Sequence, residues 1–493
     1  MKKLSFLVAM ILLLAFIPGV MLAVDASKLE PYEIVWYTLG TEREGQQAVI
    51  DKINEYLTEK FNATLKMYVN TNSDHLQKLQ LLISAREKFD ICFVSGQYAS
   101  YVSQEAFYPL RELLKEYGPA LMETFPQNLW DSVTINGEIY AVPVHKYSCS
   151  HYYFIINMDA AKKAGVDTDW NTADVSKMDR WNAFINYLLE MEKVGADTKG
   201  FITSMGSQPF TALFPNEAMT GNSNDPGFVI LGDDTFTGYE RNQVFNQFAT
   251  PEFEGYVRDA YKLAQAGALP LDPETIAKLD QHDPVVSVQD SMAKRLSGYE
   301  VTYGADFEPY FISYAFQTTD KIYGSMNAIS DTSDDPARAM MFLNALIEDR
   351  DFANLVFYGI EGVNWNRNAD GQIEMTDPKT YAMTTWALPG FLTAEPDISL
   401  PIDMVDRYNA FAKELVPADN LGFALDEEPI MIELAAIRQV VAEYLEPLTK
   451  GLANPDTELP KFIDGLQSAG VDTAIAEMQK QLDAWRVAQG YDK

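Results

Sequence analysis

The chain is poor in the residues and motifs that most often carry enzyme chemistry. It contains only two cysteines and four histidines among 493 residues. The pair His145 and His151 lacks the spacing of metal ligands. No Gly-x-Ser-x-Gly elbow, Gly-rich phosphate loop or His-Glu-x-x-His motif occurs. We therefore expect no enzyme activity, no catalytic residue, no cofactor and no bound metal.

Basic residues are also scarce. The chain has 38 Lys and Arg against 71 Asp and Glu, which gives a formal charge of −33. Such a field repels phosphate backbones and anionic lipid surfaces, so nucleic-acid binding is excluded as a principal function. We interpret the excess of acid as a solubilising exterior. A role in attracting cations is the alternative interpretation.

Long apolar runs are absent except at the N-terminus. Lys2 and Lys3 precede the apolar run Leu4–Val20, and small residues follow at Ala23 and Ala26. This pattern predicts a signal peptide over residues 1–26, cleaved after Ala26 or Ala23, although an uncleaved anchor is the alternative. The 467 residues that follow Ala26 are enough for two or three domains.

The first third of the mature chain alternates between strand and helix patterns. The ranges 33–37, 63–69 and 89–94 are rich in β-branched and aromatic residues, and the ranges 42–61 and 72–83 have apolar residues at helical spacing. This alternation predicts α/β layers. Cys92 lies in the third strand and is interpreted as a small buried residue, while a Cys92–Cys149 disulfide stays open.

Turn chemistry marks a hairpin within residues 133–143. Asn136-Gly137 supplies the two positive-φ positions of a type I′ turn, and Pro143 ends the second strand. Farther along, Asp335-Pro336 predicts a helix start, with Asp as N-cap and Pro at the first helical position. Other expected elements are strands at 152–156, 300–303 and 323–329, helices at 181–194 and 252–266, and a long loop at 209–238.

Several segments resemble those of one known family. The run Gly137–Pro143 resembles the Gly-x-x-Tyr-x-x-Pro segment of extracellular solute-binding proteins (family 1) of sugar-type ABC importers, and Asn157–Asp159 resembles the Asn-Lys-Asp that follows there. Tyr358–Gly362 and the final helix Ile475–Trp485 are similar to a lipoprotein (LipO-like) subgroup with a C-terminal domain of unknown function. These matches span essentially the whole mature chain.

The resemblance implies an α/β, two-lobed periplasmic-binding-protein fold of type II. Each lobe is then a β-sheet flanked by helices, with a ligand cleft between the lobes. We expect residues 27–143 plus 302–350 in the first lobe, and 144–301 plus 351–493 in the second. The implied function is capture of a sugar or oligosaccharide and its delivery to the permease subunits of an ABC importer. We expect a monomer, periplasmic or extracellular, without the lipid-anchoring cysteine of many relatives.

Candidate ligand contacts come from aromatic and polar residues beyond strand ends. Sugars require aromatic faces for stacking and polar groups for their hydroxyls, and in open α/β sheets such groups follow the carboxyl ends of strands. The candidates are Thr38, Glu42, Ser95, Gln97, Tyr98, His145, Tyr147, Tyr303, Asp306, Trp365 and Trp386. By contrast, Trp181 and Trp485 lie on helical apolar stripes and are expected in cores.

Three alternatives stay open. Residues 366–377 have oxygen side chains at the positions of a calcium loop, but a β-hairpin turning at Asp370-Gly371 fits better. A secreted glycan-processing enzyme would need a carboxylate pair such as Asp306 and Glu361. A binding protein that presents its solute to a sensor kinase would share the fold expected here.

Overall fold

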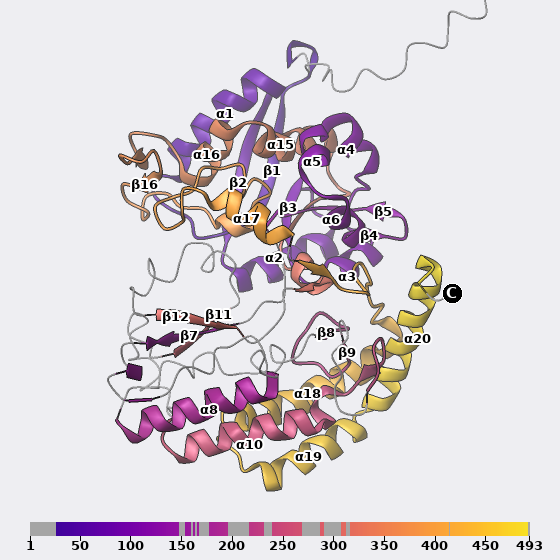
Figure 1. Ribbon diagram of the computed structural model, residues 1–493. Coiled ribbons are helices and arrows are strands. Elements are labelled where there is room, and N and C mark those ends of the chain that lie inside the picture. The colour runs from indigo at the N-terminus through magenta and orange to yellow at the C-terminus, as the bar shows by residue number, and fades with distance from the viewer. Residues whose placement is uncertain are drawn as a thin grey trace, which may run out of the picture.

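The chain forms two lobes, each with its own buried apolar cluster (Figure 1). The computed structural model describes residues 26–146, 153–158, 161–162, 165–166, 177–195, 216–230, 239–268, 286–289, 307–311, 316–413 and 415–491. Except for Ala26, the predicted signal peptide lies outside these residues. Within the described part of the chain, no helix is both long enough and apolar enough to cross a membrane.

A five-stranded sheet in the order β2-β1-β3-β14-β6 forms the centre of the first lobe. Its strands are β1 (Tyr32–Leu39), β2 (Ala63–Asn70), β3 (Ile91–Val94), β6 (Ala141–Pro143) and β14 (Met326–Ile329). β1 pairs in parallel with β2 and β3, whereas β14 is antiparallel to both of its neighbours. All four residues of β3 are buried, as expected for a strand covered on both faces.

Helices cover this sheet. They are α1 (Gln46–Phe61), α2 (Asn72–Ala85), α3 (Tyr98–Ser103), α4 (Arg111–Tyr117), α5 (Pro119–Thr124), α6 (Gln127–Ser132), α14 (Thr319–Tyr323), α15 (Pro336–Glu348) and α16 (Arg350–Tyr358). The predicted start of α15 is confirmed, because the Asp335 carboxylate accepts the Arg338 backbone N–H at 3.1 Å. α15 packs against α1, α4, α5 and α16, so this N-cap fixes the direction of a central helix.

The predicted type I′ turn is present. Asn136 and Gly137 have φ angles of 51° and 81°, and the two-residue strands β4 (Thr134–Ile135) and β5 (Glu138–Ile139) pair around them. The hairpin ends earlier than predicted, because Ala141–Pro143 leaves it as β6 and joins the main sheet beside β14. The turn therefore brings the chain back to the sheet immediately before it leaves the lobe.

The second lobe combines short sheets with long helices. Its strands are β7 (Tyr153–Asn157), β8 (Asn216–Ala218), β9 (Phe228–Ile230), β10 (Val244–Phe245), β11 (Val286–Gln289) and β12 (Phe307–Phe311). Its helices are α8 (Lys177–Lys193), α10 (Pro251–Gln265), α18 (Met431–Thr449), α19 (Pro455–Ser468) and α20 (Val471–Gln489). α18 contacts α10, α19 and α20, so the end of the chain completes a core begun by α8 and α10 (Figure 1).

The boundary between the lobes differs from the expected one at residue 350. Residues 352–394 pack into the apolar cluster of the first lobe. This range includes most of α16 and the hairpin of β15 (Trp365–Arg367) and β16 (Ile373–Met375). α17 (Met404–Ala412) forms a small cluster of its own beside them. The chain returns to the second lobe only after β17 (Val416–Pro417). The segment that begins with α16 stays in the first lobe because α16 packs against α1 and α15.

A two-stranded sheet joins two of the connections between the lobes. β13 (Phe316–Gln317) lies just before α14, and it pairs in parallel with β17, which follows α17. The Ala418 backbone N–H donates to the Gln317 carbonyl at 2.9 Å and extends this pairing. The second and third crossings therefore run side by side, and any hinge motion must move them together.

Two tryptophans and one cysteine show where the predicted core side chains lie. Trp181 is buried in the second-lobe core as expected, and Trp485 is half-buried against that core beside Phe423. Cys92 is buried in β3, where burial raises the pKa of its thiol. Cys149 and the predicted strand at 300–303 lie outside the described residues. The loop predicted at 209–238 is described over 216–230, and there the prediction is wrong in part, because β8 and β9 form an antiparallel pair within it.

Candidate functional site

The carboxyl ends of β1, β2, β3 and β6 meet at one edge of the first-lobe sheet. This follows from the topology, because β6 and β3 both run antiparallel to β14. The edge faces the second lobe (Figure 1). Loops beyond such an edge are where open α/β sheets place ligand contacts. We call the ends of β1, β3 and β6, together with residues 384–387, the carboxyl edge.

A segment from later in the chain crosses this edge. The Gly45 backbone N–H donates to the Thr380 carbonyl at 2.9 Å, and Ser325 Oγ and Asn327 Nδ2 donate to the carbonyls of Trp386 and Ala387 at 2.7 and 2.9 Å. Gly40 allows the end of β1 to lie close to Val69 on β2. Its φ is +149°, and a Cβ there would lie 2.7 Å from Val69 Cγ1.

Trp386 is the exposed aromatic side chain at the carboxyl edge. It is 43% exposed, although Ser325 Oγ donates to the Trp386 carbonyl and Asn327 Nδ2 donates to the carbonyl of the next residue, Ala387. The Phe93 ring meets it edge-on with centroids 5.8 Å apart, and Lys146 Nζ lies 4.7 Å from its ring centroid. A partly exposed indole beside an ammonium group can stack on a sugar face and donate hydrogen bonds to its hydroxyls.

Five of the eleven predicted contact residues lie at or next to this edge, although the ring nitrogens of His145 are buried. Ser95 and Gln97 follow β3, Glu42 follows β1, His145 follows β6, and Trp386 lies in the crossing segment. Gly96 holds the β3 loop in place, because its N–H donates to the Tyr323 carbonyl at 3.0 Å. The strand-end argument thus identified the loops that the structure brings together.

Three other predicted contacts have packing roles instead. Tyr98 is buried, its hydroxyl donates to the Val133 carbonyl at 2.8 Å, and it accepts the Tyr140 N–H at 3.0 Å. Trp365 is 3% exposed, and its Nε1–H donates to the Gly359 carbonyl at 2.9 Å. Thr38 is fully buried because its position on β1 turns its side chain into the lobe.

The remaining three predicted contacts, Tyr147, Tyr303 and Asp306, lie outside the described residues. Asp306 was also one member of the carboxylate pair considered for a glycan-processing enzyme. Its partner in that pair, Glu361, forms an ion pair with Arg367, with Nε and Oε1 3.4 Å apart. Both residues of that ion pair lie in the first lobe around the β15–β16 hairpin.

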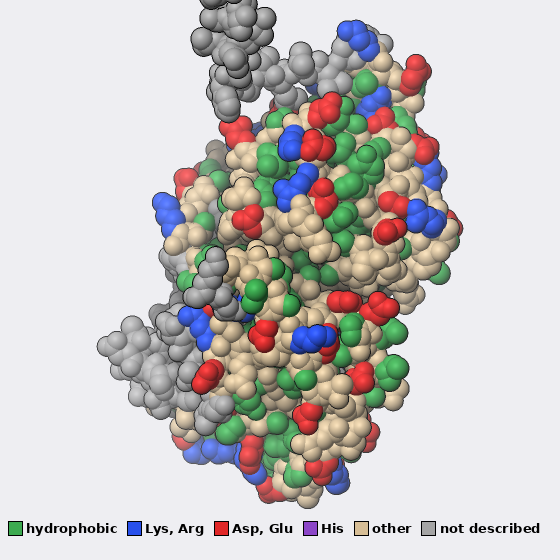
Figure 2. All heavy atoms as spheres, turned by 90° about the vertical axis from the view of Figure 1, so that its right-hand side faces the viewer, with side chains coloured by type: hydrophobic (Ala, Val, Ile, Leu, Met, Phe, Trp, Pro, Cys, Tyr) green, Lys and Arg blue, Asp and Glu red, His purple; other side chains and the backbone are tan. Residues whose placement is uncertain are grey.

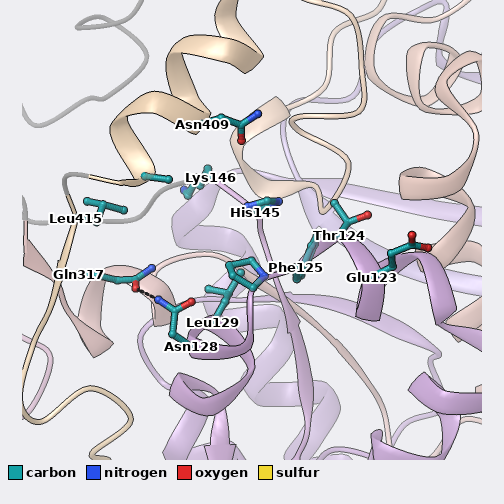
Figure 3. Close-up of a pocket in the computed structure, with 12 residues that line it drawn as sticks. Glu123, Thr124, Phe125, Asn128, Leu129, His145, Lys146, Gln317, Asn409 and Leu415 are labelled. Atoms are coloured by element: carbon teal, nitrogen blue, oxygen red, sulfur yellow. Dashed lines mark hydrogen bonds between the residues drawn. The ribbon is translucent and has the colours of Figure 1, made fainter.

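Lys146 is a functional candidate that the sequence reading missed. It directly follows His145 at the end of β6, so the strand-end argument could have included it. Both residues also line a pocket of about 290 Å³ where the crossings leave the first lobe (Figure 3). The other lining residues are Glu123, Thr124, Phe125, Pro126, Asn128, Leu129, Gln317, Asn409, Ala412 and Leu415.

The pocket is tied to the connections between the lobes. Asn128 Nδ2 on α6 donates to Gln317 Oε1 on β13 at 2.6 Å, the bond drawn as a dashed line in Figure 3. The His145 ring lies 5.0 Å from that of Phe125, and burial lowers the pKa of His145 to about 4. His145 is therefore neutral at pH 7.

The calcium-loop alternative for residues 366–377 is replaced by a hairpin. Trp365–Arg367 pairs with Ile373–Met375, and Gly371 has a φ of +84° at the turn. Asn368 Oδ1 accepts the backbone N–H groups of Asp370 and Gln372, so it is occupied within the turn. Across the part of the chain that the structure describes, no three His, Cys, Asp or Glu side chains are grouped to hold a metal.

The fold and the site define a class of protein. Two lobes share three crossings, and the carboxyl edge of one sheet presents an aromatic and polar surface to the other lobe (Figure 1). This is the architecture of type II solute-binding proteins, which close around a ligand by hinge motion. On the face in Figure 2, Asp and Glu side chains are scattered over both lobes among Lys and Arg, as a solubilising exterior requires.

Comparison with known proteins identifies the family. The model of the bacterial extracellular solute-binding proteins matches residues 42–351, more than half of the chain, and the chain belongs to that family. A domain of unknown function (DUF3502) matches residues 419–487, which include α18, α19 and most of α20. The resemblance noted in the sequence is therefore confirmed, including the distinctive C-terminal region.

Relatives with similar chains come from Streptococcus pneumoniae. A carbohydrate ABC transporter substrate-binding protein is 23% identical over 91% of this chain and 90% of its own length. The crystal structure of an N-glycan transport solute-binding protein (NgtS) superposes with a TM-score of 0.77 at 21% identity, covering 92% of this chain and 99% of that one. Its complex with Man1GlcNAc gives a TM-score of 0.72 at the same identity and coverage. These structures confirm the predicted fold.

Proposed function

We propose that this protein is the substrate-binding component of an ABC importer, and that it captures a sugar or oligosaccharide between its lobes. The observation that carries this proposal is Trp386, an exposed indole beside Lys146 at an edge that faces the second lobe. A saccharide offers a flat C–H face to the indole and hydroxyls to the polar loop ends of β1, β3 and β6.

The family and the relatives support the same assignment. Membership of the extracellular solute-binding family favours an exported protein, in accord with the predicted signal peptide. A pneumococcal relative is named as a carbohydrate ABC transporter substrate-binding protein, and NgtS structures contain Man1GlcNAc and Man5GlcNAc. We propose that the ligand of this chain is also a carbohydrate, and we assign no particular glycan to it.

We propose that the protein binds its ligand without catalysing a reaction. The ligand stabilises the closed arrangement through contacts that exist only when the lobes approach, and the closed form then docks on the permease. We propose that Glu42, Ser95, Gln97, His145 and Trp386 contribute first-lobe contacts, with Lys146 added from the structure. Tyr147, Tyr303 and Asp306 remain proposed contacts on the same grounds as before. We propose a monomer that is free in the periplasm or outside the cell.

A ligand screen tests this function. Residues 27–493 are screened by thermal shift against mannose- and N-acetylglucosamine-containing glycans, other neutral oligosaccharides, uronic-acid oligosaccharides, peptides and polyamines. A ligand at 100 times its dissociation constant adds about 2.7 kcal/mol to the free energy of unfolding. We expect one saccharide series to respond and mass spectrometry to recover it unchanged. A response confined to peptides or polyamines would refute the carbohydrate assignment, and cleavage of the glycan would refute the absence of catalysis.

A further inference from the structure

A cluster of oxygen-bearing side chains lies where the second and third crossings meet, with two of its residues buried and one partly buried. Glu217 lies on β8 in the second lobe, Asp320 lies in the first turn of α14, and Asn420 follows β17. Glu217 is 4% exposed and Asn420 is 3% exposed. These three residues come from both lobes and from the last crossing, and the cluster is separate from the carboxyl edge described above.

Hydrogen bonds hold these side chains together. The Asp320 backbone N–H donates to Glu217 Oε1 at 3.0 Å, and the Asn420 side chain also hydrogen-bonds the Glu217 carboxyl group. Thr319 Oγ1 accepts the Gly422 N–H at 2.9 Å and ties α14 to the segment around Asn420. Burial, and then the neighbouring Asp320 charge, raise the pKa of Glu217 to about 8.

Each residue of the cluster has one buried side-chain oxygen without a hydrogen-bond partner in the described part of the chain. These oxygens are Glu217 Oε2, Asp320 Oδ1 and Asn420 Oδ1, and they are accompanied by the hydroxyl oxygens of Thr318 and Tyr323 near the same turn of α14. Neither Glu217 nor Asp320 forms an ion pair with a described Lys or Arg. Glu217 is buried and Asp320 is partly buried. Two such neighbouring carboxyl groups without a cation are costly, because desolvation and mutual repulsion act together.

We propose that Glu217, Asp320 and Asn420 bind a hard cation of the Ca²⁺ class at this junction. Carboxylate and amide oxygens are the ligands that Ca²⁺ takes, and the hydroxyl groups of Thr318 and Tyr323 or water complete a flexible oxygen shell. Mg²⁺ fits less well, because it demands near-ideal octahedral geometry and loses its water reluctantly. The ion offsets the repulsion of the two carboxylates and links the second lobe to the start of α14.

Calcium titration of the EDTA-treated, dialysed protein tests this site. At pH 7.5 and 0.15 M NaCl, we expect Ca²⁺ to raise the melting temperature of residues 27–493 by several degrees and Mg²⁺ to raise it less. Metal analysis after gel filtration is expected to find about one Ca²⁺ per chain. Glu217→Gln and Asp320→Asn preserve the side-chain shapes, and each should remove both the shift and the bound ion. Measuring both variants keeps the test valid if one folds poorly.

Asp370→Asn is the matched control, because it removes one carboxylate from the calcium-like sequence of the β15–β16 hairpin. It is expected to keep the full Ca²⁺ response. A response lost in Asp370→Asn but kept in Glu217→Gln would overturn the proposal in favour of the hairpin. A response kept in all three variants would mean diffuse binding to an acidic surface and would equally overturn it. If Ca²⁺ has no effect on the parent protein, the carboxyl pair holds a proton or water instead, and the proposal is wrong.

Discussion

The two lobes build their apolar cores from different kinds of elements. The first lobe is organised around one five-stranded sheet whose strand ends converge on Trp386 and Lys146. The second lobe, as far as it is described, has three-stranded sheets, and its core is completed by α18–α20. The first lobe thus gathers the proposed ligand contacts at its sheet edge, whereas the C-terminal helices of the second lobe serve mainly to close a core.

Core truncations in the two lobes should have the largest effects and should test whether the lobes unfold separately. Phe462 packs on the rings of Phe248, Phe253 and Tyr444, and Phe352 stacks on Tyr56 with centroids 4.1 Å apart. Phe→Ala at either site should cost about 3–5 kcal/mol of the free energy of unfolding through lost burial and a cavity. Differential scanning calorimetry of both variants measures the effect.

If the lobes are independent, Phe462→Ala lowers only a second-lobe transition and Phe352→Ala only a first-lobe transition. A single transition that shifts equally in both variants would break the comparison and show that the joint couples the lobes. Leu81→Ala on the exposed side of α2 serves as the control, and it should leave every transition nearly unchanged.

The junction should show a pH dependence that the lobe cores do not. In EDTA, the raised pKa of Glu217 means that the folded state binds more protons than the unfolded state between pH 4.5 and about 8. Stability should therefore fall as the pH rises through this window. Urea unfolding at several pH values measures the slope, and Glu217→Gln should reduce it. An unchanged slope in the variant would assign the dependence to other groups.

The exposed and buried tryptophans of the first lobe should separate affinity from stability. Trp386→Ala should weaken binding of the glycan found in the screen by about 10- to 100-fold, equal to about 1.4–2.8 kcal/mol, because it removes a stacking face. Its melting temperature should change little. Calorimetric titration and thermal melts make the measurement. Trp365→Phe is the matched control, with lower stability and retained affinity, and a reversal of this pattern would place the ligand elsewhere.

The support beneath Trp386 should have the smallest effect. Ser325→Ala removes the bond from Ser325 Oγ to the Trp386 carbonyl and should cost about 1 kcal/mol. If the bond serves mainly to position the indole, affinity falls about fivefold, which corresponds to that energy. Titration of Ser325→Ala and Ser325→Thr compares loss of the hydroxyl with its retention. Equal affinity for Ser325→Ala and the parent would show that the neighbouring Asn327 bond suffices.

Local chemistry made much of the fold predictable. The turn at Asn136-Gly137 and the N-cap at Asp335 depend on residues only a few positions apart, and both are confirmed. The strand-end rule named loops that lie together at the carboxyl edge, but it could not give side-chain direction. Tyr98 and Trp365 therefore entered the candidate site although each is buried with its own hydrogen bonds.

The sequence by itself determined the alternating elements, the turns, the family resemblance and the loops that flank the candidate site. These depend on short-range periodicity and on residue types. Only the tertiary structure decided that residues 352–394 belong with the first lobe, that Lys146 lies over Trp386, and that Glu217 meets Asp320 from 103 positions away. Each of those contacts depends on how distant segments cross one another, because their burial and charge arise only when the lobes are assembled.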